Sequence, residues 1–403
     1  MDMSGTDYVD WFFQFAFAAA TATIVAGAVA ERCKMAAYLC YSTFLLGVVY
    51  PVVIHMIWSP KGFLSSTTND PFKDSGMLDF AGGGVVHLTG GVCALISIVI
   101  LGPRVDRFFD RTGKALDSPA TMPVHSVTMQ MLGTLILWVG WYGFNSGSTL
   151  KMNNLQQAQS AALCVVTTTI SAASGCVSAM FLRYFYGAVD GIRFFDLTAA
   201  MNGALSGLVA ITAGCSIIQP QVAVVVGIVS GAVYLGASNL LIKFKIDDVV
   251  DAVPVHMANG IWSCMSVGLF ADPGLIEIAY GRDTGPAGWM YEWGRSSGDF
   301  RLMTCQLCGI MFIIGWVTVT MVPYFLLLQW LGWFRVHQVT EDIGLDLSSH
   351  GTSTYTFDKV DSSVEEKYAK RLAEKIARRK GSSGGDSSEG DHSGDSSEGD
   401  QSV

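Results

Sequence analysis

The segment Asp79–Gly102, DFAGGGVVHLTGGVCALISIVILG, joins an acidic residue, a histidine and an unbroken apolar run. Most of it is apolar enough to cross a bilayer as a helix, for which about 20 such residues suffice. Asp79 stands where that helix would begin, and His87 falls inside it. Ionisable side chains are expensive within a membrane and usually mark a site or a pathway. The segment therefore predicts a membrane helix with a functional interior.

The whole chain has the composition of a polytopic membrane protein. Of its 403 residues, 50% are hydrophobic and 15% are charged, whereas a soluble domain carries roughly 25% charged residues. Glycine lies within apolar runs such as GLVAITAG and GIVSGAVYLG, as in closely packed membrane helices. The predicted fold class is an all-α membrane protein, a helical bundle with about nine spans. The predicted spans cover residues 8–30, 36–58, 80–101, 122–146, 156–183, 195–214, 220–242, 249–271 and 302–334.

The distribution of basic residues predicts the orientation. Lys and Arg are more frequent in the loops on the side of the C-terminus, and further basic residues follow the last span. Because basic residues are concentrated on the cytoplasmic side, we expect a cytoplasmic C-terminus and an external N-terminus in the plasma membrane. Residues 1–7 form a short acidic extracellular N-terminus without the positive region of a signal peptide, so the first span is predicted to be retained.

The composition changes after the transmembrane domain, which we assign to residues 8–334. Residues 335–360 are polar and are predicted to form a cytoplasmic regulatory tail. Residues 361–380 have the Glu/Lys spacing of an exposed helix with both basic and acidic side chains. Residues 381–403 contain GDSSEGD twice and lack apolar residues, so this acidic Ser/Gly repeat is predicted to be disordered. No metal, cofactor or nucleic-acid partner is predicted.

Two histidines recur in one motif. His87 and His256 both lie in V-H-x-x-x-G, and each follows an aspartate: Asp79 is eight residues before His87, and Asp251 is five residues before His256. The number of helices between them makes the two spans run in opposite directions, as in inverted repeats that meet near the bilayer midplane. We therefore expect a pair of imidazoles facing each other. Asp79 either caps its helix or stabilises a cation directly.

A second group of candidates is aromatic. Trp141 and Phe144 lie three residues apart within WVGWYGFNSGS, which ends at Ser148, and Phe17 follows a phenylalanine four residues earlier. Aromatic stripes at helical spacing usually belong to the core. A ring face can also hold a small cation through its quadrupole. Trp58 stands at the outer end of its predicted span, where tryptophan is common in any membrane protein.

These residues together resemble the ammonium transporter family (Amt/Mep/Rh), and most closely its plant-type members. The resemblance runs from about residue 8 to residue 357 and includes LDFAGGGVVH, LWVGWYGFNSGS, GLVAITAGCSIIQP, DDVVDAVPVH and RVHQVTEDIGLDLSSHG. It implies a homotrimer whose subunits each conduct ammonium, or ammonia, with methylammonium as an analogue.

The resemblance also implies roles for individual residues. Trp58, Phe17 and Ser148 would recruit the ammonium ion, supported by Asp79, and Phe17 and Phe144 would form the gate. His87 and His256 would be twin histidines of the pore, with Trp141 and Tyr50 on its wall. In plant-type relatives the cytoplasmic tail closes the pores when a kinase phosphorylates it, and Ser348 stands at the corresponding position.

The resemblance departs from the family in one respect. Its members usually have eleven spans, and this chain begins at what resembles the third. The alternatives are therefore a non-transporting ammonium sensor or an inactive truncated paralogue. A facilitator of urea, water or CO2 is a further alternative. An intramembrane enzyme is disfavoured, because no HExxH, no GxSxG and no nucleophile beside a base occurs.

Overall fold

The computed structural model describes residues 5–122, 124–187, 193–282, 285–295 and 298–350. The chain divides into two compact units, Met1–Val336 and His337–Val403. The described part of the second unit contains α13 and the π-helical turn η5. The predicted helix at 361–380 and the acidic repeat at 381–403 lie outside the described residues.

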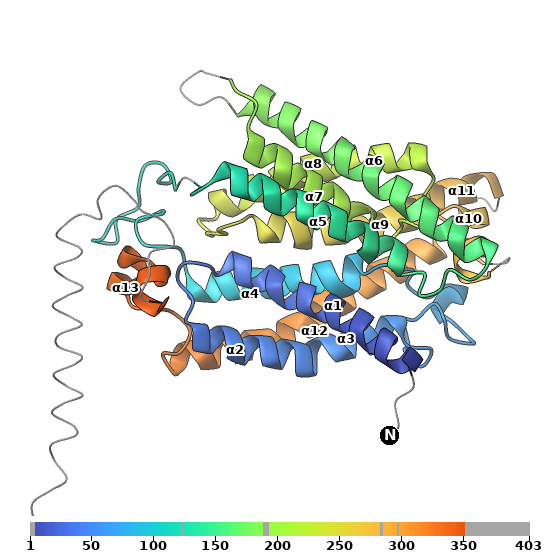
Figure 1. The fold of residues 1–403 in the computed structure, drawn as a ribbon, viewed down its shortest axis with the longest axis horizontal. Helices are drawn as coiled ribbons and strands as arrows, with labels where there is room; N and C mark the ends of the chain where they lie inside the picture. Colours follow the sequence, from blue (N-terminus) through green and yellow to red (C-terminus); the bar gives the residue numbers. More distant parts are fainter. Residues whose placement is uncertain (1–4, 123, 188–192, 283–284, 296–297, 351–403) are drawn as a thin grey trace, which may run out of the picture. The chain divides into compact units, whose positions relative to one another are not determined.

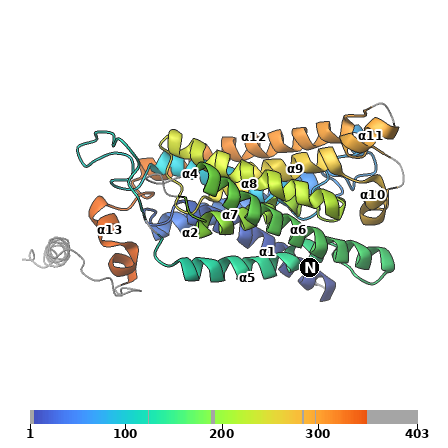
Figure 2. The same ribbon diagram turned by 90° about the horizontal axis from the view of Figure 1, so that it is seen from above.

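The first unit is a bundle of helices that run largely alongside one another (Figures 1 and 2). The shorter elements are the π-helical turns η1 (Leu45–Val49), η3 (Gly83–Leu88) and η4 (Val253–Ala258) and the 3-10 turn η2 (Phe72–Asp74). The helices are α1 (Gly5–Ala28), α2 (Met35–Phe44), α3 (Tyr50–Trp58), α4 (Thr89–Leu101), α5 (Val127–Gly147), α6 (Leu155–Tyr186), α7 (Leu197–Thr212), α8 (Pro220–Lys243), α9 (Asn259–Phe270), α10 (Pro273–Tyr280), α11 (Trp289–Arg295) and α12 (Arg301–Trp330). In the second unit, α13 spans Gln338–Ile343 and η5 spans Asp346–His350.

Each predicted span contains a helix, although their lengths differ from the prediction. Among the described residues, seven helices are long and apolar enough to cross a membrane, and an eighth span results if α9 and its continuation are counted together. That span ends at Phe270, where the chain bends by 112° into α10. The predicted span at 195–214 is the apolar helix α7, whose 16 residues fall short of a full crossing. The first helix already begins at Gly5, inside the segment predicted to precede it.

Helix starts follow the capping residues in the sequence. The Ser126 hydroxyl, the Asn154 amide oxygen and the Asp196 carboxylate each accept a backbone N–H in the first turn of α5, α6 and α7. These side chains satisfy donors that a helix start leaves free, which fixes where each span begins.

Small residues let α6, α7 and α8 pack closely. The Ser171 hydroxyl on α6 donates to the Gly207 carbonyl on α7 at 2.7 Å, and the Ser178 hydroxyl donates to the Ile228 carbonyl on α8 at 2.8 Å. Figure 1 shows these helices together with α5 on one side of the bundle, and α1 to α4 with α12 on the other.

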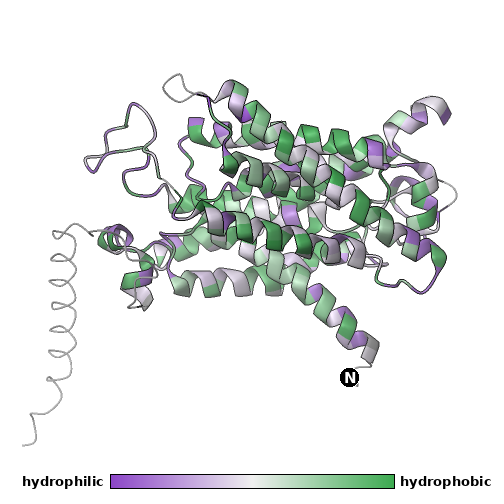
Figure 3. Ribbon diagram, turned by 45° about the horizontal axis from the view of Figure 1, so that its top comes forward, coloured by the Kyte–Doolittle hydropathy of each residue, from purple (hydrophilic) through white to green (hydrophobic). Residues whose placement is uncertain are grey.

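Apolar side chains also cover much of the helices' outer faces. On α5, Ile136 and Val139 are 63% and 69% exposed, and hydrophobic colour runs along the helices while hydrophilic colour gathers at their ends and in loops (Figure 3). Such faces are the surfaces that lipid or neighbouring membrane helices contact. The fold is that of an all-α membrane protein.

Candidate functional site

The two motif histidines meet inside the bundle. His87 belongs to the π-helical turn η3 that leads into α4, and His256 belongs to the corresponding turn η4 that leads into α9. Their Nδ1 atoms are 3.2 Å apart, and the rings are stacked with centroids separated by 5.2 Å. The Nε2 atom of His87 is buried and has no hydrogen-bond partner among the described residues. The pair can therefore share a hydrogen bond and still accept a proton from elsewhere.

The glycine of each V-H-x-x-x-G motif explains how the histidines come so close. A Cβ atom on Gly91 would lie 2.3 Å from the Met257 nitrogen, and one on Gly260 would lie 2.9 Å from the Leu88 nitrogen. Each glycine thus faces the residue that follows the histidine of the other motif. This reciprocal crossing matches the inverted relationship that the motif predicts.

Aromatic rings extend the pair toward one end of the bundle. Trp141 stacks on His87 with centroids 5.0 Å apart and planes inclined by 9°. Its indole N–H donates to the Thr212 hydroxyl at 3.0 Å, which fixes the ring. Phe144 lies 5.5 Å from the His87 ring and stacks on Phe17 at 4.0 Å. Phe144 therefore contacts both His87 and Phe17.

Beyond these phenylalanines lies a cavity of about 320 Å³, which we call the outer pocket. Trp58, Asp79 and Ser148 line it, and Trp58 contacts Phe17 edge-on at 5.9 Å. The outer pocket, the two phenylalanines and the histidines form a continuous series of side chains. The other lining residues are Phe13, Gln14, Ile57, Ser66, Thr67, Met77, Phe80, Thr149, Leu150, Gln157, Ser160, Ile278, Ala279 and Tyr280.

The Asp79 carboxylate accepts hydrogen bonds from backbone N–H groups and is not free to point into the outer pocket. Its Oδ1 accepts the N–H groups of Gly82 and Gly83, and its Oδ2 accepts those of Gly84 and Val85, at 2.7 to 3.0 Å. Its own carbonyl accepts the Trp58 indole N–H at 2.7 Å. Asp79 thus caps the turn that carries His87 and also holds Trp58 in the wall of the outer pocket.

The structural counterpart of Asp79 is Asp248, and not Asp251, the aspartate singled out before His256 in the sequence. The Asp248 Oδ2 accepts the Val253 N–H at 2.7 Å, at the start of the turn that carries His256. Asp251 instead accepts hydrogen bonds from the Tyr234 and Ser238 hydroxyls at 2.9 and 3.0 Å, and it adopts a left-handed φ of 58°. The sequence did contain a signal for Asp248: it precedes His256 by eight residues, the same spacing that separates Asp79 from His87.

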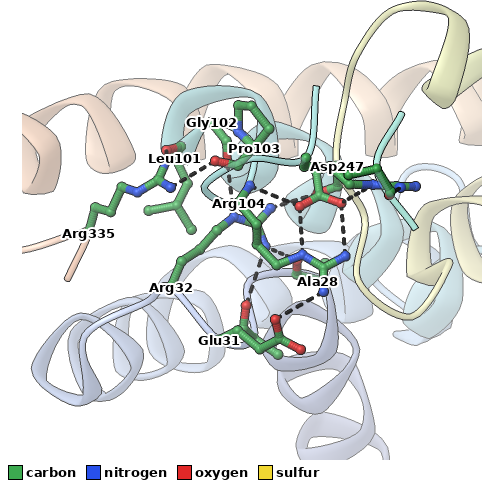
Figure 4. A network of polar contacts seen from close by, with 12 residues as sticks. Ala28, Glu31, Arg32, Leu101, Gly102, Pro103, Arg104, Asp247 and Arg335 are labelled. Carbon is green, nitrogen blue, oxygen red and sulfur yellow. Dashed lines mark hydrogen bonds and ion pairs between the residues drawn. The ribbon is translucent and has the colours of Figure 1, made fainter. Parts of the chain in front are cut away.

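A network of arginines joins helix ends remote from the outer pocket (Figure 4). Arg104 donates from Nε and Nη2 to the Asp247 carboxylate, at 2.8 and 3.1 Å, and from Nη1 to Glu31 at 3.0 Å. The fully buried Arg32 donates to the carbonyls of Gly102 and Asp247 at 2.8 and 2.6 Å. The network thereby fixes the ends of α1 and α4 to the loop that leads into the His256 turn.

That network also sets the ionisation of Asp247. Burial alone would raise the pKa of this carboxyl group, but the hydrogen bonds and charge of Arg104, with the charge of Arg32, hold it below its usual range. Asp247 is therefore an anion at neutral pH.

The remaining candidates lie apart from the ring series. Tyr50 is buried on α3 and lines a second groove with Trp11 and His55, and that groove meets the ring series at Trp58. Ser348 lies in the second unit, where its hydroxyl donates to the Gly344 carbonyl at 2.8 Å. Within the described ranges, no group of three His, Cys, Asp or Glu side chains could hold a metal ion.

The structure adds polar residues to the outer pocket that the sequence did not indicate. Gln14 and Gln157 bring amide groups from α1 and α6, and Tyr280 brings a phenol from α10. Gln14 stands between Phe13 and Phe17 in the sequence, so its position on the same helix face could have been inferred. The position of Tyr280 could not be inferred from sequence, because Tyr280 reaches the pocket only through the bend before α10.

Comparison with known proteins identifies the family. The profile of the Ammonium Transporter Family matches residues 1–355. The chain belongs to this family. It is 39% identical over 368 residues to the putative ammonium transporter 1 member 5 of Arabidopsis thaliana, covering 89% of this chain and 71% of that protein. It is 38% identical over 382 residues to ammonium transporter 1 member 3 of Solanum lycopersicum, covering 92% and 79%.

Solved structures of the ammonium transporter family share the fold. A protein described as a sensor Amt protein matches with a TM-score of 0.71 at 29% identity, covering 85% of this chain and 77% of its own. Mep2 of Candida albicans matches with a TM-score of 0.68 at 28% identity, covering 80% and 65%. The chain is thus a multi-pass membrane protein of the ammonium transporter family, and it resembles plant members.

Proposed function

We propose that this chain is an ammonium transporter rather than an enzyme. It would recruit NH4+ at the outer pocket, deprotonate it and conduct NH3 past the twin histidines, with or without the proton. The observation that carries this proposal is the contact of Phe144 with both Phe17 and His87, which links the pocket to the imidazole pair. The names of the relatives, ammonium transporters of Arabidopsis thaliana and Solanum lycopersicum, support the substrate.

The outer pocket suits a small cation with hydrogen-bond donors. The faces of Trp58 and Phe17 attract a cation through their quadrupoles, at about 0.5 to 2 kcal/mol per ring. The Ser148 hydroxyl donates to the Phe144 carbonyl at 2.9 Å, so its lone pairs remain able to accept from ammonium. Asp79 would act through Trp58 and the His87 turn rather than by touching the ion, since four N–H groups occupy its carboxylate.

Loss of a proton would solve the main energetic problem of passage. An unpaired ion in an apolar interior pays a large desolvation cost, whereas NH3 is neutral. Phe17 and Phe144 close the pocket toward the interior, so an ion cannot pass with its water shell. The buried histidine pair behind them offers the proton a route of its own. Potassium would be rejected, because it has no proton to give up.

The test is methylammonium uptake by yeast lacking its own ammonium transporters, with surface expression verified. We expect this chain to support uptake and His87→Ala to abolish it or remove its selectivity over potassium. His55→Ala is the matched control, because His55 is exposed on α3 and lies outside the ring series. Absence of uptake by protein that reaches the membrane would refute the proposal.

A sensor is the second candidate, because one of the similar solved structures is described as a sensor Amt protein. A sensor would bind methylammonium at the outer pocket without appreciable flux. Binding to the purified protein, together with negligible uptake by proteoliposomes, would favour it over transport.

The family resemblance further supports an assembly and an orientation. We expect a homotrimer in the plasma membrane, with the N-terminus outside and the C-terminus in the cytoplasm. Tyr50 would contribute to the pore wall, and Ser348 would be the residue that a kinase phosphorylates to close the pore. A phosphomimetic Ser348→Asp that leaves uptake unchanged would contradict this last role.

A further inference from the structure

We propose that Asp248 receives the proton that leaves the histidine pair, on the side remote from the outer pocket. The inference rests on the proposed function, because it requires that ammonium be deprotonated before passage. It assigns to Asp248 a step that neither histidine can complete, namely release of the proton from the bundle.

The first argument is the repeated arrangement at the two ends of the histidine pair. Asp79 precedes His87 by eight residues, and Asp248 precedes His256 by the same number. Each carboxylate accepts from the backbone at the start of the π-helical turn that carries its histidine: Asp79 from residues that include Gly83 and Gly84, and Asp248 from Val253. Because the two turns cross reciprocally, the aspartates lie at opposite ends of the pair. Asp79 adjoins the outer pocket, and Asp248 adjoins the loop that Arg104 contacts.

The second argument is a difference between the two carboxylates. Both oxygens of Asp79 are occupied, each by two backbone N–H groups. In Asp248 the Oδ2 accepts the Val253 N–H, whereas the buried Oδ1 has no hydrogen-bond partner in the described part of the chain. An unpaired buried carboxylate oxygen is costly unless something binds it. A proton arriving from the histidines would satisfy it.

The third argument comes from the charges around Asp248. Asp247 is ion-paired with Arg104, and Asp251 accepts the hydroxyls of Tyr234 and Ser238. Asp248 has neither kind of partner among the described residues. Its burial, and then the negative charge of Asp251, raise the pKa of Asp248 to about 7, although the backbone N–H groups of Val253, Ala252 and Val250 oppose this shift. A group with such a pKa can both accept and release a proton near neutral pH.

The proposed step moves one proton and breaks no other bond. Ammonium gives a proton to the unpaired Nε2 of His87 and becomes NH3. The Nδ1–H of His87 passes to the Nδ1 of His256, 3.2 Å away. His256 then gives up its Nε2 proton to a water molecule. Because Asp248 precedes His256 by eight residues, about 12 Å along a helix, water must carry the proton to the Asp248 Oδ1, which becomes a neutral carboxylic acid. The Oδ1 atom is buried, but the residue as a whole is only partly buried, so a rotation of the carboxyl group brings its O–H to water. Release of the proton there restores the carboxylate.

The test uses the purified full chain in proteoliposomes given an ammonium pulse, with charge movement and methylammonium uptake measured in parallel. Asp248→Asn keeps a carbonyl oxygen for the Val253 N–H but cannot titrate, whereas Asp248→Glu keeps an ionisable group. We expect Asp248→Asn to lower the charge moved per methylammonium by at least about tenfold, and Asp248→Glu to restore most of it. A capping role alone predicts the reverse order, with asparagine close to the unsubstituted chain, and that result would overturn the proposal.

Other outcomes separate this inference from the proposed function. Uptake without charge movement by the unsubstituted chain overturns the role of Asp248 and leaves transport intact. Absence of both uptake and charge movement refutes transport itself. If the substituted proteins do not fold, the internal pH of vesicles holding the unsubstituted chain is varied instead. Charge movement should then rise with internal pH around a midpoint near the Asp248 pKa of about 7, and a flat profile would overturn the proposal.

Discussion

Gly91 faces the backbone of Met257 so closely that a Cβ atom would lie 2.3 Å from the Met257 nitrogen and 2.6 Å from its Cα. Gly260 stands in the same relation to Leu88 on the other helix. The spacing of His87 and His256 therefore depends on the absence of side chains four residues beyond each histidine.

Gly91→Ala should separate the two turns and damage both stability and transport. Overpacking of this kind costs about 1 to 3 kcal/mol, here with backbone atoms that cannot move aside easily. We expect a lower Tm in detergent and a loss of methylammonium uptake of about tenfold or more. Gly140→Ala is the control, because a Cβ there would meet nothing within 4 Å on α5. Equal behaviour of the two variants would contradict the crossing argument.

Replacement of Trp58 should weaken recruitment in two separable ways. Trp58→Phe keeps an aromatic face but loses the indole N–H that binds the Asp79 carbonyl, and Trp58→Leu loses the face as well. From a cation–π contribution of about 0.5 to 2 kcal/mol, Trp58→Leu should raise the methylammonium concentration for half-maximal uptake by roughly 2- to 30-fold.

The phenylalanine variant should be affected less, and the maximal rate should change little in either protein. A fall in maximal rate at unchanged half-saturation would mean that Trp58 acts on passage rather than on recruitment.

Removal of the Asp79 carboxylate should destabilise the turn that carries His87. Asp79→Ala leaves four backbone N–H groups without their acceptor, and loss of a cap alone costs about 0.5 to 2 kcal/mol. We expect a lower Tm and loss of uptake, whereas Asp79→Asn should recover part of the stability because one amide oxygen remains. An alanine variant as stable as the unsubstituted chain would show that these bonds contribute little.

The Arg104–Asp247 pair predicts how stability changes with pH. The folded-state pKa of Asp247 is lowered, so its contribution is complete above the unfolded pKa of about 3.9 and is lost as pH falls through the lower folded value. The Tm should therefore fall as pH is lowered below about 4, and less steeply in Asp247→Asn. At neutral pH, Arg104→Gln should cost about 3 kcal/mol, because it leaves the Asp247 charge buried without its main partner. If the Tm of the unsubstituted chain and that of Asp247→Asn changed with pH in the same way, the lowered pKa of Asp247 would be contradicted.

Much of the fold could be predicted from sequence because helical membrane segments are long and apolar, and their polar interruptions are few. The contact of His87 with His256 followed from a repeated motif and from the direction of two spans. What sequence could not supply was the path of the chain between elements. The bend at Phe270 and the short α7 depend on tertiary packing, and the same bend brings Tyr280 to the outer pocket.

The three aspartates that precede His256 show a different limit. Asp247, Asp248 and Asp251 lie within five residues, and composition alone does not distinguish an ion-paired, a capping and a hydroxyl-bonded carboxylate. The partners that separate them come from Arg104 and Tyr234, which are distant in sequence. The one sequence signal for the capping aspartate was its spacing, because Asp248 precedes His256 by the same eight residues that separate Asp79 from His87. This signal can be recognised once the two turns are known to be alike.

The contact between His87 and His256 joins the same atom of two like rings. A neutral pair can place only one hydrogen between those Nδ1 atoms, so one ring is the donor and the other is the acceptor. Passage of a single proton exchanges these roles and leaves both rings in the opposite tautomer. The tautomers of the two rings therefore depend on the direction of the last transfer. Both rings must return to their starting tautomers before a second proton can follow in the same direction. Such a requirement would set an upper limit on turnover that the width of the pore does not determine.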